Sequence, residues 1–244
     1  MPGWSDPGAA VLWPQVWLRT ACPPPESPDT THDVALALAD AAGDGRRLRH
    51  AGYGWWTVAP VGTLPGRVVA AKAGLAWGAP AAAPTAAGAR WRGRLTGHLF
   101  FDRRRWALAG DVTLESDAAP NLSGRVENVA LAPLDAKSVR PAASARGQLP
   151  AFVLQAGPGA DAAWSGAVRM AAAAPGDAPE GLPDAQAFRG DWRATGHGPD
   201  AEEVAGRLRL WTPLAAGADP GTAWPGQAVL VAGFGAARTT RGRP

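Results

Sequence analysis

A short pattern, apolar–x–Gly–x–apolar, recurs six times between residues 91 and 208 of this 244-residue chain. Within each copy, apolar or small residues alternate with others, which is the period of a strand with one buried face. Glycine weakens a strand, so its fixed register predicts a packing role: room for a facing aromatic ring and a strand that can coil into a closed sheet. A general bias toward Gly and Ala would not explain that register. The six glycines are Gly93, Gly110, Gly124, Gly166, Gly190 and Gly206.

From Ala89 onward, only strands and turn-forming residues are evident. Consecutive short strands without helices are typical of an antiparallel barrel or sandwich. We predict a mainly β chain with an eight-stranded antiparallel barrel, whose interior is filled by side chains or holds one small ligand. The predicted strands cover about residues 89–100, 105–116, 120–130, 150–156, 162–172, 186–196, 202–212 and 227–238.

The two faces of these strands differ in chemistry. Arginines gather on one face and large apolar residues on the other. An eight-stranded lumen is too narrow for the arginines, and placing them against lipid would cost about 2–4 kcal/mol each. We therefore expect a dry interior and a charged exterior, as in a soluble barrel. Expected inside are Trp91, Leu108, Leu122, Trp164, Phe188, Trp192, Leu208, Leu230, Ala232 and Phe234; expected outside are Arg189, Arg193, Arg207 and Arg209.

The region before the barrel predicts a small handle-like helix-plus-strand unit. Thr30 and Thr31 can cap a short helix carrying Val34, Leu36 and Leu38. The aromatic and β-branched content of residues 49–60 favours a strand, and residues 68–77 form a second. The Pro- and Ala-rich stretch 79–88 is typical of a linker. The expected organisation is a disordered leader or linker at 1–30, a handle-like subdomain at 31–88, and the barrel at 89–240.

Charge and cysteine content exclude several classes. The net charge is +3, and the arginines are spread along the strands rather than gathered in a run, which argues against nucleic acid as a partner. A single cysteine, Cys22, allows neither an internal disulfide nor a zinc cluster of cysteines. No stretch is long and apolar enough for a transmembrane helix, and the N-terminus carries no clear signal peptide.

Several of the strands resemble those of a known family. Residues 187–194, 203–206 and 231–238 are similar to the end of the β-barrel domain of the transferrin-binding protein B family of bacterial surface lipoproteins. The resemblance covers about residues 50 to 240. Its other parts are residues 91–97, 111–114 and 122–128, which resemble the first three barrel strands, and Tyr53-Gly-Trp-Trp, which resembles the sequence that precedes the barrel.

This resemblance implies an eight-stranded barrel beside a strand-rich handle, and binding rather than catalysis. It also implies a place at the bacterial cell surface or outer membrane, or secretion, with a role in iron acquisition. The chain differs from the family in having one barrel rather than two lobes, short loops and no clear lipoprotein cleavage box. Recognition of transferrin itself therefore does not follow from the resemblance.

The candidate chemistry is sparse, and we predict no catalytic or metal-binding residues. Its four histidines are not at metal-ligand spacing, and no nucleophile elbow is present. His98 and His197 are candidate haem ligands by analogy with haem-binding relatives, although surface positions are the expectation for both. The acidic turn Asp200 to Glu203 is expected to be solvated.

The predicted function is recognition of a host or environmental protein by loops and handle, with the chain acting as a monomer. The loops with most freedom are 133–150, 173–185 and 213–226. Lys137, Arg140 and Arg146 in the first loop are the predicted binding residues, facing an acidic partner surface. The alternative is a small-ligand or haem carrier with its site at the barrel mouth. A one-to-one absorbance change on adding haem would favour the carrier, and a filled interior would favour the protein binder.

Overall fold

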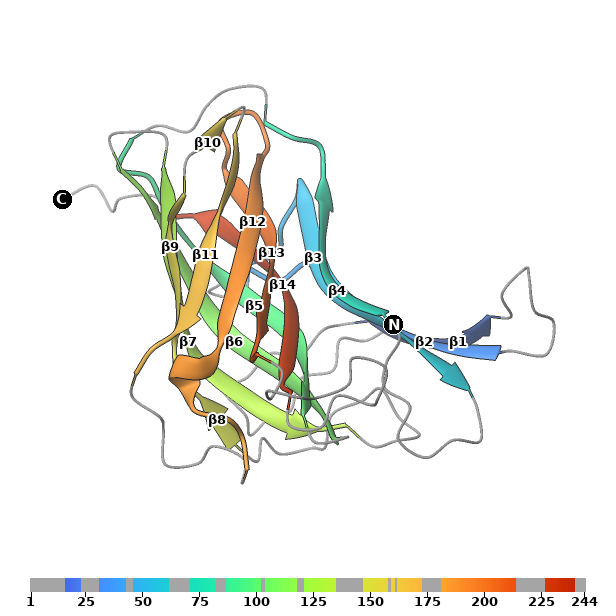
Figure 1. Cartoon of the computed structure of the whole chain (residues 1–244). Helices are drawn as coiled ribbons and strands as arrows, with labels where there is room; N and C mark the ends of the chain where they lie inside the picture. Colours follow the sequence, from blue (N-terminus) through green and yellow to red (C-terminus); the bar gives the residue numbers. More distant parts are fainter. Residues whose placement is uncertain are drawn as a thin grey trace.

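The protein is built almost entirely of β-strands. The computed structural model describes residues 16–22, 31–42, 46–61, 71–81, 87–101, 104–117, 121–134, 147–157, 159–160, 162–172, 181–213 and 227–239. In these ranges there is no α-helix, and one short 3-10 turn, η2, spans Ala185–Ala187. The strands form two sheets, a ten-stranded one that closes into a barrel and a four-stranded one beside it (Figure 1).

Eight antiparallel strands close the barrel, as the sequence predicted. Each pairs with the next, and the ring closes because β9 pairs with both β7 and β11. Two short strands extend it: β8 (Gly147–Leu149) on β7 and β10 (Gly159–Ala160) on β11. The barrel strands are β5 (Arg90–Phe101), β6 (Arg104–Ser116), β7 (Leu122–Pro133), β9 (Phe152–Gly157), β11 (Ala163–Met170), β12 (Arg189–His197), β13 (Glu203–Trp211) and β14 (Val229–Arg238).

The interior and exterior faces are those that the alternation predicted. Every side chain expected inside belongs to one buried apolar cluster. Arg189, Arg193, Arg207 and Arg209 are all exposed on the outer wall. The lumen is therefore occupied by side chains, with Trp91, Trp192, Phe152, Phe188 and Phe234 all fully buried.

Two of the repeated glycines have the packing role that the sequence suggested. A Cβ on Gly206 would lie 2.3 Å from the Phe234 ring, and one on Gly166 would lie 2.8 Å from the indole nitrogen of Trp192. Both distances are shorter than a real Cβ contact, so any larger residue would have to displace a buried ring. The fixed register of glycine is thus a consequence of large rings on neighbouring strands.

The four-stranded sheet, which we call the handle, corrects two expectations. Its order is β1 (Val16–Cys22), β2 (Thr31–Ala39), β3 (Ala51–Val61) and β4 (Ala71–Gly78), all antiparallel. The predicted helix is wrong, because β2 occupies its place: apolar residues at every second position have the period of a strand, not of a helix. Val16–Cys22 likewise pairs with β2 instead of acting as a disordered leader.

Strands β3 and β4 of the handle pack against the outer wall of the barrel over β5, β13 and β14, whereas β1 and β2 extend away from it (Figure 1). This contact explains why β14 is buried on both faces, the feature that weakened its alternation in the sequence. A Cβ on Gly233 would lie 2.2 Å from the carbonyl oxygen of Gly54, and one on Gly235 would lie 2.5 Å from the Tyr53 ring. Small residues on β14 thus let the two sheets approach closely.

The domain limits at residues 30, 88 and 240 stay predictions.

The long connections leave the barrel at one end, which we call the loop end. The register pairs Phe100 with Val229 and Trp211 with Arg189, so the strand ends that flank residues 213–226 and 173–185 in the sequence lie side by side. Pro133, at the end of β7, lies opposite Trp106 near the same end.

Within the described ranges, no helix has the length and hydrophobicity needed to cross a bilayer.

Candidate functional site

The three predicted binding residues, Lys137, Arg140 and Arg146, lie outside the described residues, so their role stays a prediction. The strands that flank their loop are described. The chain leaves β7 at Pro133 and returns in β8 at Gly147, which pairs with Leu131. The loop is thus anchored at the loop end of the barrel.

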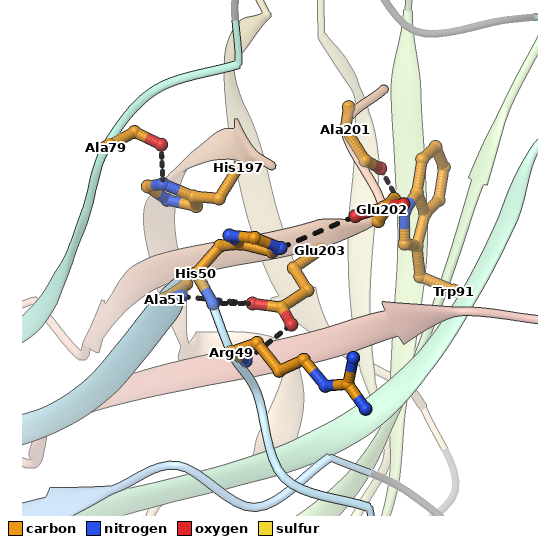
Figure 2. Close-up of polar contacts among 9 residues, drawn as sticks. All are labelled: Arg49, His50, Ala51, Ala79, Trp91, His197, Ala201, Glu202 and Glu203. Carbon is orange, nitrogen blue, oxygen red and sulfur yellow. Dashed lines mark hydrogen bonds and ion pairs between the residues drawn. The ribbon is translucent and has the colours of Figure 1, made fainter. Parts of the chain in front are cut away.

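At the opposite end, which we call the junction end, a buried glutamate joins the handle to the barrel. Glu203 begins β13, and its carboxylate accepts hydrogen bonds from the backbone N–H groups of Arg49 (2.6 Å), His50 (2.9 Å) and Ala51 (3.0 Å) (Figure 2). The residue is only 5% exposed. Three donors aimed at one carboxylate satisfy a buried charge that would otherwise be costly.

This arrangement corrects the expectation of a solvated acidic turn. Asp200 and Glu202 are exposed, as expected, but Glu203 is not. Its partners precede it by more than 150 positions. Sequence reasoning missed Glu203 because nothing local distinguishes it from its acidic neighbours. The one signal in the sequence was that Glu203 lies at the start of a predicted strand, which places it at an end of the barrel and not in the turn.

Three further contacts tie this end together, and Figure 2 shows them around Glu203. The indole N–H of Trp91 donates to the carbonyl oxygen of Ala201 at 2.9 Å, and His197 Nδ1 lies 3.0 Å from the carbonyl oxygen of Ala79. His50 Nε2 lies 3.5 Å from the carboxylate of Glu202. His197 is 3% exposed, so the expected surface position is wrong for this residue.

A charged groove of about 900 Å³ opens beside the junction. We call it the junction groove. It lies between the turn that precedes β3 and the barrel rim, and its walls carry five arginines and three acidic residues: Arg46, Arg47, Arg49, Arg90 and Arg238, with Asp200, Glu202 and Glu203. Arg90 also pairs with Glu115 at 3.1 Å. The mixed charges resemble the polar rim of a protein interface more than an apolar ligand pocket.

His98 is enclosed beneath the handle. Its ring stacks on Trp55 of β3 with centroids 5.0 Å apart and planes at 14°, and it is 1% exposed. Neither ring nitrogen has a hydrogen-bond partner within the described residues. Burial, reinforced by the positive charges of Lys72 and Arg105, lowers the pKa of His98 to about 3. The expected surface position is wrong here too, and a ring covered by Trp55 is poorly placed to meet a haem iron.

A neighbouring cation, Lys72 of handle strand β4, is directed into the same sheet-to-sheet interface. The Lys72 amine lies 4.6 Å above the Phe100 ring, and burial lowers its pKa to about 8. Burial also raises the pKa of Tyr53, whose hydroxyl donates to the carbonyl oxygen of Ala41 at 2.7 Å. These contacts place Tyr53 and Trp55, from the Tyr-Gly-Trp-Trp sequence, in the sheet-to-sheet interface.

A second groove, of about 640 Å³, runs between β4 and the barrel wall formed by β11, β12 and β13. We call it the edge groove. Arg193, Arg207 and Arg209 line it together with Asp191. Arg209 donates to Asp191 at 3.1 Å. Both grooves thus lie on the outer surface of the barrel, whereas the lumen is packed.

The described residues hold no cluster of side chains suited to a metal ion. No three His, Cys, Asp or Glu side chains among them are close enough together to hold a metal ion. The buried carboxylate of Glu203 is bound by three backbone donors. What this arrangement offers chemically is charged, concave surface along the two grooves.

No family model matches the chain, nor does any curated protein. Solved structures do. A variant of transferrin-binding protein B from Haemophilus parasuis aligns with a TM-score of 0.52 and 12% identity, over 93% of this chain and 38% of that one. Isotype 1 transferrin-binding protein B from Neisseria meningitidis aligns with a TM-score of 0.45 and 15% identity, over 91% and 36%. The chain thus spans little more than a third of either protein, and it shares its fold with one part of the H. parasuis protein.

Proposed function

We propose that this chain is a non-catalytic module that binds another protein, with the barrel and handle as a rigid scaffold. The observation that carries the proposal is the filled lumen. Trp91, Trp192, Phe188 and Phe234 occupy the space that a carrier would leave for its ligand, and each is at most 1% exposed. A small-ligand or haem carrier with an internal site would need these rings to move.

The arrangement of the connections supports recognition by loops. The stretches 133–150, 173–185 and 213–226 all join strands at the loop end, so a single partner surface can meet all three. Binding residues are commonly carried by loops that a rigid scaffold positions. We propose that Lys137, Arg140 and Arg146 contribute the positive charge of this surface.

The fold likeness supports the cellular setting of the proposal. The H. parasuis structure whose fold this chain shares is, by name, a transferrin-binding protein. We propose that this module acts outside the cytoplasm, at a bacterial cell surface or secreted. Its partner is a host or environmental protein, and a role in iron acquisition is part of the proposal.

The proposal is tested by association kinetics with a partner captured from host serum. Replacing Lys137, Arg140 and Arg146 by Ala should slow association and weaken its salt dependence, while the melting temperature stays nearly unchanged, because rim charges mainly steer encounter. The matched control replaces Arg92, Arg125 and Arg169, three exposed arginines of the barrel wall.

An unchanged association rate in the loop variant would mean that this loop is not the recognition surface. A one-to-one absorbance change on adding haem to the full chain would favour the carrier instead. Turnover of any substrate by the purified protein would overturn the non-catalytic assignment.

A further inference from the structure

The outer edge of β4 is unpaired within the described part of the chain. The handle sheet ends at β4, whose only strand partner there is β3, in a continuous register from Ala51↔Gly78 to Val58↔Ala71. An unpaired edge presents a row of N–H and C=O groups to which another strand can add. This edge borders the edge groove, so it faces the barrel wall over β11, β12 and β13.

The usual protections of an edge strand are few on β4. Natural edges are blunted by proline, bulges or charged side chains. Between Ala71 and Gly78 there is no proline and no register shift, and the one charged residue is Lys72 at its start. The Lys72 amine is directed onto the Phe100 ring. From Ala73 to Trp77 the edge is regular and carries no charge.

The wall of the edge groove carries uncompensated positive charge. Arg193 and Arg207 are directly opposite each other on β12 and β13, and both are exposed. Like charges in that position repel and destabilise a sheet. The one carboxylate that lines the groove, Asp191, is already bound by Arg209. An anionic side chain entering the groove would relieve the repulsion between Arg193 and Arg207.

These observations select one kind of occupant. We propose that the edge groove binds an extended acidic segment of a partner protein, which adds as a fifth strand to β4 and places its carboxylates against Arg193 and Arg207; the proposal rests on the protein-binding function proposed above. Strand addition takes its affinity from backbone hydrogen bonds and its specificity from alternate side chains.

The position of the edge groove suits this occupant. A strand added to β4 would lie about 4.8 Å from it in the plane of the handle sheet, on the side where the groove opens between β4 and the barrel wall. The added strand would therefore lie over the barrel wall, with every second side chain directed at it. Beyond the C-terminal end of β4, the chain is joined to the end of β12: Pro80 forms a β-bridge with His197, and the Ala81 N–H donates to the carbonyl oxygen of Gly196. An added strand would therefore end before these residues.

The test uses the full chain and a synthetic peptide of about eight residues, the length of an ordinary strand, in which glutamate alternates with threonine. All its glutamates fall on one face when it is extended. The expected result is saturable binding that weakens with salt and is lost for two control peptides. One control has lysine in place of glutamate, and the other has alternate backbone nitrogens methylated so that it cannot pair along one edge.

Protein variants locate the site. R193E/R207E should weaken peptide binding about tenfold or more, since about 1.4 kcal/mol is a factor of ten. R169E/R189E changes two exposed arginines of the same wall that do not line the groove, so its affinity should stay within about twofold of wild type. Thermal melts of both variants check that each is folded.

Absence of peptide binding, equal binding of the lysine peptide, or equal loss in the two variants would each overturn the inference. These outcomes are separable from failure of the proposed function. Loop-dependent association that persists without peptide binding overturns the edge-groove site alone. Absence of both overturns the protein-binding function as well.

Discussion

At the scale of single residues, the barrel interior contains glycines packed directly against large aromatic rings of neighbouring strands. Gly206 lies beside Phe234 and Gly166 beside Trp192, each too close for a Cβ. Trp192 is fully buried, and its indole N–H also donates to the carbonyl oxygen of Gln155 at 3.2 Å. Its side chain therefore fills the lumen and connects the two strands on either side of β11.

Trp192→Ala should lower the free energy of unfolding by about 3–5 kcal/mol, because it leaves a cavity at the centre of the lumen. Trp77, the large apolar residue that is 45% exposed, provides the control. Trp77→Ala should cost about 1 kcal/mol or less. Chemical denaturation measures both, and equal midpoints for wild type and Trp192→Ala would contradict the assignment of Trp192 to the lumen.

His98 gives the protein a specific sensitivity to acid. The folded state keeps His98 neutral down to a pKa of about 3, whereas the unfolded chain binds the proton near the usual value of 6.5. Because the unfolded state binds more protons between these values, stability falls as pH drops below about 6.5, by up to about 1.4 kcal/mol per pH unit. The stability is fully present above that range.

His98→Phe should reduce this acid slope by about one proton between pH 6 and pH 4, because phenylalanine can stack on Trp55 without titrating. The matched control is His50→Gln, since the His50 side chain is 39% exposed. Urea denaturation at several pH values gives the slope. An unchanged slope in His98→Phe, or an equal reduction in the control, would contradict the buried neutral state of His98.

Residue positions in the barrel were predictable, and those at the handle interface were not. Alternation identified the lumen side chains because each strand has one face in the core and one outside. The burial of His98, Lys72 and Glu203 depends on the packing of the handle, which contains Lys72, against the outer face of β5, β13 and β14. The sequence of β14, small or apolar on both faces, was the visible sign of that covering.

At the scale of elements, the contact between handle and barrel depends on Glu203. A carboxylate at the start of β13 accepts three backbone hydrogen bonds from the first residue of β3 and the two residues before it. The same region is held by the bridge between Pro80 and His197. The handle is thus fastened at both its entry to β3 and its exit from β4.

Glu203→Gln should lower the free energy of unfolding by about 1.5–3 kcal/mol, because hydrogen bonds to a charged group are replaced by weaker or opposed ones. Amide exchange at Arg49, His50 and Ala51 should accelerate. Glu202→Gln is the control, since the Glu202 side chain is 52% exposed and its pair with His50 should contribute little. Equal effects of the two substitutions would contradict the role assigned to Glu203.

Element type was predictable where the two-residue alternation stood alone and failed where helix-capping residues competed with it. The eight barrel strands were placed to within a few residues. The β2 strand was mistaken for a helix because its capping threonines and terminal glycines outweighed the two-residue spacing of Val34, Leu36 and Leu38. The segment is a strand because it pairs with β1 on one side and β3 on the other. Both partners are separated from β2 in the sequence by a connection, so local sequence signals do not reveal the pairing.

At the scale of the whole molecule, the two ends of the barrel differ. The junction end carries short turns and the contacts to the handle, whereas the loop end carries the long connections. The predicted binding residues lie in one of those connections, while the two grooves lie along the handle. The closed ring and filled lumen provide the stiffness that holds these surfaces in fixed positions.

The central claim is that handle and barrel form one rigid scaffold, and native-state hydrogen exchange of the full chain tests it most directly. The backbone amides of β3 in the handle and of β14 in the barrel should open with the same free energy, close to that of global unfolding. The glycine contacts and the Glu203 hydrogen bonds are the physical reason. Exchange of the β3 amides through a much smaller opening free energy than that of β14 would contradict the claim.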